Sequence, residues 1–374
     1  MIQTKMMGLI AALGMLSAKL IAAEPAKVEI DQPKAYQVIQ REGFEPQRAS
    51  IHEPEGPELG FADVVFRAPR PEGVKGDWQY RLVLHEHGFG ETYEWHLFDV
   101  GTDEKQLKGL LEVPAGGWYR LEIRCVNDEE TTAAGTVAAI GVGEVFVVAG
   151  QSYAGGWNDD VLKVADPSQA VSTYDWEAKT WRVANDPPPH NGEGGSIWPA
   201  LGDMLVPTLR VPVAFVNVSV GATSSTKWAP DGPLHKRLCQ VGREIGLFRA
   251  VLWQQGESDV IEKTPAETYV KNVREIRDAA SEAWGFEPPW LLAKSTLHPT
   301  VYKDPIGERR IRGAIDELWS VPGFRPGPDT DLLGGDNRGG PNSRRHFSAV
   351  GQRRAALLWF VALWNELQQQ TVKE

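Results

Sequence analysis

The chain has 374 residues, which is more than one ordinary domain usually holds, so two domains are expected. Its 42% hydrophobic and 24% charged residues are typical of a soluble globular protein. The formal net charge of −11 argues against a nucleic-acid partner, because phosphates require a basic protein surface.

The first residues have the pattern of a secretory signal peptide. Lys5 precedes an apolar run over residues 6–18, and Ala22 and Ala23 precede a polar segment. The run is short for a membrane span, although an N-terminal membrane anchor is the alternative. We therefore expect residues 1–23 to be removed, which would leave a periplasmic or secreted protein without membrane contact.

Residues 27–140 contain short runs rich in Val, Tyr, Trp and Ile, separated by Gly, Pro and Asp clusters. Regular short strands with turn signals are typical of a β-sandwich. The expected strands lie at 34–40, 63–69, 79–87, 93–100 and 117–126.

Strand-like and helix-like patterns alternate over residues 144–368, which predicts a parallel sheet with helices on both faces. Thr264 and Ser348 are the expected N-caps of two of the helices. The expected buried strands are 144–150, 211–219, 248–255 and 288–297, and the expected helices are 196–206, 264–285, 307–321 and 348–367.

Only two cysteines are present, Cys125 and Cys239. Export would permit a disulfide between them, but they fall in different predicted domains and each has apolar neighbours. Two buried free thiols are the favoured interpretation. Their number and spacing do not form a zinc site.

Polar residues and glycines follow each predicted strand of the second domain, where open α/β sheets form their sites. Ser152 follows the first strand and would be a nucleophile if a base and oxyanion donors lay beside it; capping a following helix is the alternative. Gly221 could bring its backbone amide close to a substrate oxygen, and Gln255 could donate its side-chain amide. Both could equally be turn residues.

His346 is the candidate base for Ser152. It lies in a loop just before a helix, where catalytic residues are often found. His298 ends a predicted strand and is the rival, although a structural role beside Pro299 is favoured for it.

Four segments, "GQSY" at 150–153, "NVSVGATS" at 217–224, "WQQGESD" at 253–259 and "RRHFSAVGQ" at 344–352, together resemble the SGNH-hydrolase superfamily. They are most similar to its sialate O-acetylesterase and acetyl xylan esterase-like group. The resemblance covers residues 144–368 and implies a flavodoxin-like fold, and many exported members of the group carry a preceding β-sandwich.

The resemblance implies that Ser152 is the nucleophile and His346 the general base. The backbone amides of Ser152 and Gly221, with the Gln255 side chain, would form the oxyanion hole. The implied reaction is hydrolysis of an acetyl ester on a sugar, of sialic acid or xylan type, through an acetyl-enzyme. It requires no metal or organic cofactor.

Three positions depart from the group's pattern. Tyr153 replaces an Asn, and Ala222 replaces a second Gly, which is tolerable if its φ is negative. Ser343 replaces the Asp expected three residues before the histidine. Arg344 and Arg345 add positive charge, which would disfavour the imidazolium form of the base.

The group that orients His346 is therefore open. Glu257 on a neighbouring strand end is the favoured candidate. The alternatives are Asp336 or another acid of "DTDLLGGD" at 329–336, or a neutral group of Asn342 or Ser343.

Tryptophans bracket the candidate site. Trp157 and Trp228 are the candidates for stacking on a sugar ring, whereas core packing is expected for Trp198 and Trp253. A catalytically inactive glycan-binding relative is the alternative function. A lipase or thioesterase of the α/β-hydrolase type would require Gly-x-Ser-x-Gly, and the last position here is Ala154.

Overall fold

The computed structural model describes residues 24–44, 59–101, 103–299, 302–339 and 345–370. The predicted signal peptide, residues 1–23, lies outside these ranges. Within them, no helix has the length and apolar character needed to span a membrane.

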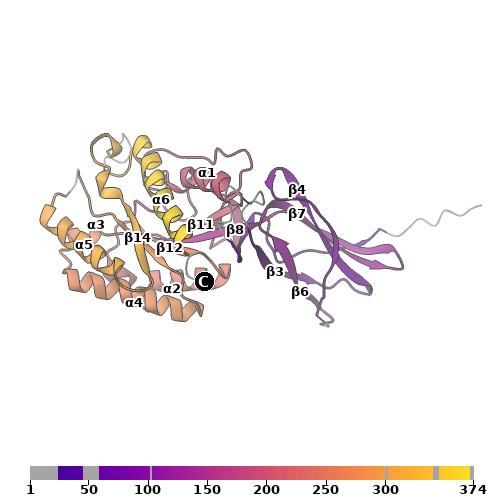
Figure 1. The fold of residues 1–374 in the computed structure, drawn as a ribbon. Helices are drawn as coiled ribbons and strands as arrows, with labels where there is room; N and C mark the ends of the chain where they lie inside the picture. The colour runs from indigo at the N-terminus through magenta and orange to yellow at the C-terminus, as the bar shows by residue number, and fades with distance from the viewer. Residues whose placement is uncertain (1–23, 45–58, 102, 300–301, 340–344, 371–374) are drawn as a thin grey trace, which may run out of the picture.

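The N-terminal region is built of strands (Figure 1). Strands β3 and β6 form an antiparallel pair, and β3 alternates strictly between exposed and buried residues, as a strand with one covered face does. Strand β4 pairs with β5 on one side and with β7 on the other, and β7 pairs in turn with β8. The bounds are β1 Ala26–Lys27, β2 Gln37–Gln40, β3 Phe61–Pro69, β4 Asp77–Phe89, β5 Tyr93–Leu97, β6 Gln106–Pro114 and β7 Gly116–Asn127.

The predicted β-rich character of this region is confirmed, and β6 is a strand that the sequence analysis missed. A separate β-sandwich domain is not confirmed, because β4, β5 and β7 belong to the same sheet as the rest of the chain. The strand that joins them is β8, Glu130–Gly150. Its first part pairs with β7, β1 and β2, and residues 144–150 pair with β11 and β12. The expected boundary at 140–144 thus falls inside one strand, and the division into two domains stays a prediction.

The C-terminal region contains the predicted parallel sheet. Its strand order is β10-β9-β11-β8-β12-β13-β14, and all neighbours are parallel except β9 and β10. The five strands β11-β8-β12-β13-β14 have the order 2-1-3-4-5 in the chain, which is the flavodoxin-like order. The bounds are β9 Val171–Asp175, β10 Thr180–Val183, β11 Val213–Asn217, β12 Ala250–Gln254, β13 Trp290–Lys294 and β14 Phe324–Asp329; the sequence analysis missed β9, β10 and β14.

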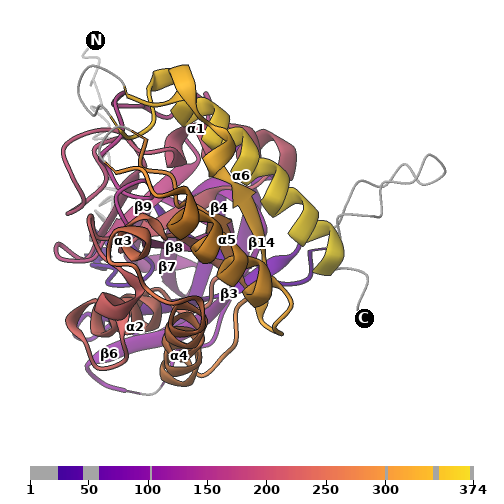
Figure 2. The ribbon, with the colours of Figure 1, turned by 90° about the vertical axis from the view of Figure 1, so that its left-hand side faces the viewer.

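Helices cover both faces of this sheet, as predicted. Helices α1 and α6 lie together on one side, and α2, α4 and α5 lie on the other (Figure 2). The bounds are α1 Trp198–Leu209, α2 Pro233–Ile245, α3 Glu257–Ile261, α4 Ala266–Trp284, α5 Pro305–Trp319 and α6 Ala349–Gln370, with short 3₁₀ helices η1 Ser225–Trp228, η2 Thr330–Leu332 and η3 Gly335–Asn337.

Only one of the two predicted caps forms. The Ser348 hydroxyl accepts a hydrogen bond from the Gly351 amide at 3.2 Å and so caps α6. Thr264 does not cap α4, which begins after Pro265 without a side-chain cap. Cys125 and Cys239 are both buried and unpaired, which confirms the prediction of two buried free thiols.

A buried ion-pair cluster lies where β8 passes from one half of the sheet to the other. The Glu144 carboxylate accepts hydrogen bonds from Arg41 at 2.8 Å and from Arg249 at 2.7 Å, and Gln40 donates a third at 3.0 Å. Burial alone would raise the pKa of Glu144, but the two guanidinium groups outweigh it and lower this pKa to about 2. The cluster joins the end of β2, the middle of β8 and the start of β12.

We expect Glu144→Gln to lower the free energy of unfolding by about 3–5 kcal/mol, because it leaves the fully buried Arg41 charge without its counterion. Urea unfolding measures the change. Glu122→Gln is the matched control, since Glu122 pairs with the partly exposed Arg81 and Arg120 and should cost about 1 kcal/mol or less. Equal losses in the two variants would contradict the importance of the Glu144 cluster.

Candidate active site

Ser152 lies just beyond the end of β8, in a tight turn. The Gly155 amide donates to the Gln151 carbonyl at 3.2 Å and to the Ser152 carbonyl at 3.1 Å, and no helix follows. The expectation that Ser152 could begin a helix is therefore wrong. Its side chain keeps 9% exposure, and no described residue forms a hydrogen bond with its hydroxyl.

Gly221 lies directly beside Ser152. The Val220 amide donates to the Gly150 carbonyl at 3.0 Å, which ties the segment after β11 to the end of β8. A methyl group added to Gly221 would lie 3.7 Å from Ser152 Cβ and 3.2 Å from Trp157 Nε1. Within the described ranges, the backbone amides of Ser152 and Gly221 have no hydrogen-bond acceptor. Two unused N–H donors therefore meet at the serine.

The residue after Gly221 contradicts one expectation. Ala222 has φ +57°, in the left-handed region. The sequence analysis expected a negative φ, at which alanine can replace glycine without strain. A residue with a Cβ costs roughly 1–2 kcal/mol in this conformation. Residue 222 thus keeps the left-handed backbone conformation that glycine favours, although it is an alanine.

Gln255 is fully buried at the end of β12, but its amide nitrogen is already used. Nε2 donates to Asp259 Oδ2 at 2.5 Å and to the Thr223 carbonyl at 3.1 Å, with Gln151 Oε1 a third acceptor at 3.3 Å. An amide nitrogen has two hydrogens, so none is left for an oxyanion. The structure contradicts the predicted donor role and makes Gln255 a support for the segments around Ser152.

Contacts on both sides of His346 hold it against the segment that follows Ser152. The Tyr153 hydroxyl donates to the Arg345 carbonyl at 2.8 Å, and the Tyr153 ring lies 4.9 Å from the His346 ring, centroid to centroid. On the other side, the Phe347 amide donates to Asn158 Oδ1 at 3.2 Å. The Phe347 carbonyl accepts a hydrogen bond from the backbone amide of Asp159 at 3.0 Å. Residues 153–159, just after Ser152, thus hold the loop that carries His346.

The electrostatic surroundings keep His346 neutral. The pKa of His346 is lowered to about 3, mainly by burial and next by the positive charge of Arg345. His298 and Arg338 contribute smaller effects in the same direction. This confirms the predicted direction of the Arg345 effect; Arg344 lies outside the described residues. His346 is only 4% exposed, and its Nε2 has no partner in the described part of the chain.

The favoured orienting acid does not contact the histidine. Glu257 is fully buried, its Oε1 accepts from the Ser295 hydroxyl at 2.5 Å, and no hydrogen bond joins it to His346. Burial raises the pKa of Glu257 to about 8, so the carboxyl is mainly protonated at neutral pH and has little charge to offer an imidazolium. The structure contradicts the predicted role.

The other candidates do not supply an orienting carboxylate. Asp336 is exposed in η3, and only its backbone carbonyl is used, by the Ser348 hydroxyl at 2.6 Å. Asn342 and Ser343 lie outside the described residues. His298, the rival base, is buried in the segment after β13, its Nδ1 has no partner among the described residues, and its charge acts on His346.

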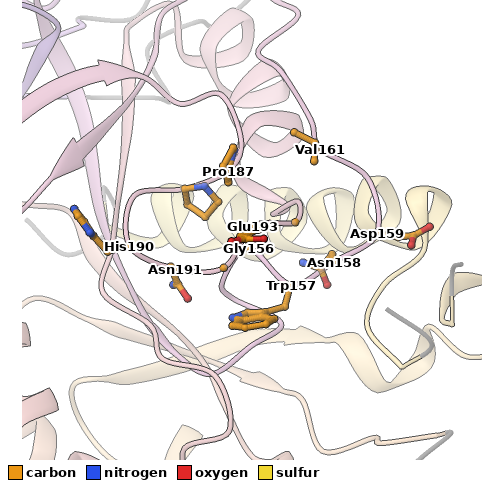
Figure 3. A pocket seen from close by; sticks show the side chains of 12 residues that line it. Gly156, Trp157, Asn158, Asp159, Val161, Pro187, His190, Asn191 and Glu193 are labelled. Atoms are coloured by element: carbon orange, nitrogen blue, oxygen red, sulfur yellow. The ribbon is translucent and has the colours of Figure 1, made fainter. Parts of the chain in front are cut away.

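The two tryptophans proposed for sugar stacking have different positions. Trp157 is 47% exposed and lines a pocket of about 910 Å³ together with the loop 187–194 (Figure 3). Trp228 is fully buried against Trp253, and its Nε1 donates to the Thr223 hydroxyl, so a sugar-stacking role for Trp228 is wrong.

The loop 187–194 is a part of the site that the sequence analysis missed. It supplies Pro187, Pro188, His190 and Glu193 to the pocket wall. The only sequence feature that could have indicated this loop is the high Pro and Gly content of "PPPHNGEGG". Among the described residues, no group of three or more His, Cys, Asp or Glu side chains could hold a metal ion.

Comparison with known proteins identifies this part of the chain. Residues 142–287 match the family model SASA, described as carbohydrate esterase, sialic acid-specific acetylesterase. The resemblance to the sialate O-acetylesterase group is therefore confirmed. The match includes the strand ends that carry Ser152, Gly221 and Gln255, and it ends before His346.

Two solved structures similar to the chain have low sequence identity to it. A carbohydrate acetylesterase from Xanthomonas citri is 14% identical, with a TM-score of 0.50 over 88% of this chain and 72% of that chain. A protein from Arabidopsis thaliana is 20% identical, with a TM-score of 0.48 over 59% of this chain and 98% of that chain. At these identities the likeness concerns the fold alone. No curated protein matches the chain.

We expect His346 to titrate far below an ordinary histidine, whose pKa is about 6.5. Histidine-labelled NMR spectra recorded from pH 8 to pH 4 should show a neutral ring at residue 346 throughout. In Arg345→Ala the midpoint should move upward, because removing the cation makes the imidazolium less unfavourable. A wild-type midpoint near 6.5 would contradict the burial and the charges seen around the ring.

Proposed function

We propose that the protein hydrolyses O-acetyl esters on carbohydrates, with Ser152 as nucleophile and His346 as general base. The match to a carbohydrate esterase family supports the reaction class. The observation that carries the residue assignment is the set of hydrogen bonds between residues 153–159 and the backbone on both sides of His346.

The proposed reaction begins with the neutral His346 imidazole, which accepts the Ser152 proton as the hydroxyl oxygen attacks the acetyl carbon. The backbone amides of Ser152 and Gly221 stabilise the oxyanion that forms. His346 then gives its proton to the leaving sugar oxygen, and an acetyl-enzyme results. Water, deprotonated by the same imidazole, releases acetate and restores Ser152.

The sugar is proposed to bind in the pocket beside Trp157. The indole lies next to Gly221, the neighbour of Ser152, and next to Gly192 of the pocket loop, since a Cβ added to these glycines would come within 3.2 and 3.1 Å of it. A flat aromatic face of this kind stacks well on a sugar ring. Acetylated sialic acid and xylan-type glycans are both candidate substrates.

Export to the periplasm or the medium is part of the proposal. It rests on the leader-like sequence of residues 1–23 alone.

We expect Ser152→Ala to lower acetate release from acetylated xylan and from p-nitrophenyl acetate by at least ~10³-fold, because losing a nucleophile removes the acetyl-enzyme route. Acetate is measured with a coupled enzymatic assay. Ser320→Ala, at the exposed C-terminal end of α5, is the control and should behave as the wild type. Equal release from Ser152→Ala and the wild type would favour the inactive glycan-binding alternative.

We expect Trp157→Ala to raise KM for the acetylated glycan about 3- to 10-fold, which corresponds to the loss of one aromatic stacking contact. Its kcat/KM for p-nitrophenyl acetate, which has no sugar ring, should change much less. A parallel loss on both substrates would mean that Trp157 supports the Ser152 turn and does not bind the sugar.

A further inference from the structure

The described part of the chain provides no carboxylate for His346, so another group must hold the ring. Among the described residues, the groups whose charges act on this histidine are Arg345, His298 and Arg338, and all three disfavour its protonation. Glu257 is held by Ser295. A positioning group therefore has to be sought among uncharged neighbours.

Tyr153 contacts three consecutive residues of the histidine loop. Its hydroxyl donates to the Arg345 carbonyl at 2.8 Å, with the Leu297 carbonyl at 3.2 Å as a second neighbour. Its ring meets His346 nearly edge-on, at 61° and 4.9 Å, and lies 5.1 Å from the Phe347 ring. Such aromatic contacts restrict both the position and the tilt of the imidazole.

Tyr153 is itself held rigidly enough to act as a support. It is 1% exposed, and the Arg338 guanidinium lies 4.4 Å from its ring centroid and 4.4 Å from that of Phe347. Arg338 is anchored by the carbonyls of Leu333 and Thr330, each at 2.8 Å. Burial also raises the pKa of Tyr153, so its hydroxyl remains a donor at neutral pH.

We propose that Tyr153 is the positioning residue of His346 and takes over the orienting part of the role that an aspartate has in a serine triad. This inference rests on the proposed Ser152 and His346 chemistry. Tyr153 fixes the ring through the Arg345 backbone and through ring contact, and it contributes no negative charge. The residue next to the nucleophile in sequence thus positions the base.

The test compares Tyr153→Phe, which keeps the ring and loses the hydroxyl, with Tyr153→Leu, which loses both. We expect kcat on p-nitrophenyl acetate to fall about tenfold in Tyr153→Phe, the effect of one hydrogen bond. The fall should reach ~10²-fold in Tyr153→Leu, as for a displaced catalytic group. KM should stay within about twofold in both, since Tyr153 does not line the pocket.

Tyr174→Phe is the matched control, because Tyr174 is a buried tyrosine whose hydroxyl donates to Glu244, away from the site. Glu257→Gln should keep more activity than Tyr153→Phe. Circular dichroism and thermal unfolding establish that each variant is folded. A kcat within twofold of wild type in both Tyr153 variants, or a larger loss in Glu257→Gln than in Tyr153→Leu, would overturn the proposal.

A second measurement separates this inference from the proposed function. The rate at which a p-nitrophenyl alkylphosphonate modifies Ser152 reports activation of the serine by His346 without any sugar or acetyl substrate. Slower modification in Tyr153→Phe, with a wild-type enzyme that releases no acetate from glycans, would refute the carbohydrate substrate and retain the positioning role. Equal modification rates in wild type, Tyr153→Phe and Tyr153→Leu would refute the positioning role.

Discussion

The site depends on the hydrogen bonds that join residues 153–159 to the backbone around His346. Ser152 and His346 are 194 positions apart (346 − 152), and the two segments meet through the Tyr153 hydroxyl, the Asn158 side chain and backbone contacts to Phe347. The Asn158 bond is buried and the Tyr153 bond is partly buried, and breaking a buried one leaves a polar group without a partner at a cost of roughly 1–3 kcal/mol. The candidate base is therefore held by the same short segment that carries the candidate nucleophile.

The sheet supplies the frame for this contact. Strand β8 lies in the middle of the parallel order and ends at Gly150, so Ser152 projects from the centre of the carboxyl edge. The segment after the neighbouring β11 brings Gly221 beside Ser152, where an added Cβ would lie 3.7 Å from Ser152 Cβ. The other neighbour, β12, is followed by Gln255, which binds the loops on either side through Gln151 and Thr223.

The charge pattern around the histidine differs from that of an ordinary serine triad. Burial and then cationic groups depress the pKa of His346, and the buried acid Glu257 is itself mainly protonated at neutral pH. A neutral imidazole can accept a proton, but here its protonated form receives no stabilisation from a carboxylate of the described chain. The contacts of Tyr153, which is itself held by Arg338, fix the position of the His346 loop.

The sequence by itself determined the parallel sheet, the helices on both of its faces and the strand ends at which Ser152 and Gly221 meet. These features follow from hydrophobic periodicity and from the rule that parallel strands end at one edge, both of which are local or topological. It also indicated His346 through its loop position.

Only the tertiary structure decided which polar atoms remain free. Gln255 lost its predicted role because Asp259 and Thr223 occupy its amide nitrogen. Glu257 lost its role because burial raises the pKa of its carboxyl to about 8 and no hydrogen bond joins it to His346. Trp228 and Trp157 have the same side chain and opposite exposure, which composition cannot distinguish. Tyr153 departs from the group's sequence pattern, and in the folded chain it contacts the His346 ring and the Arg345 carbonyl. Partners and burial arise from contacts between distant segments, and those contacts exist only once the chain has folded.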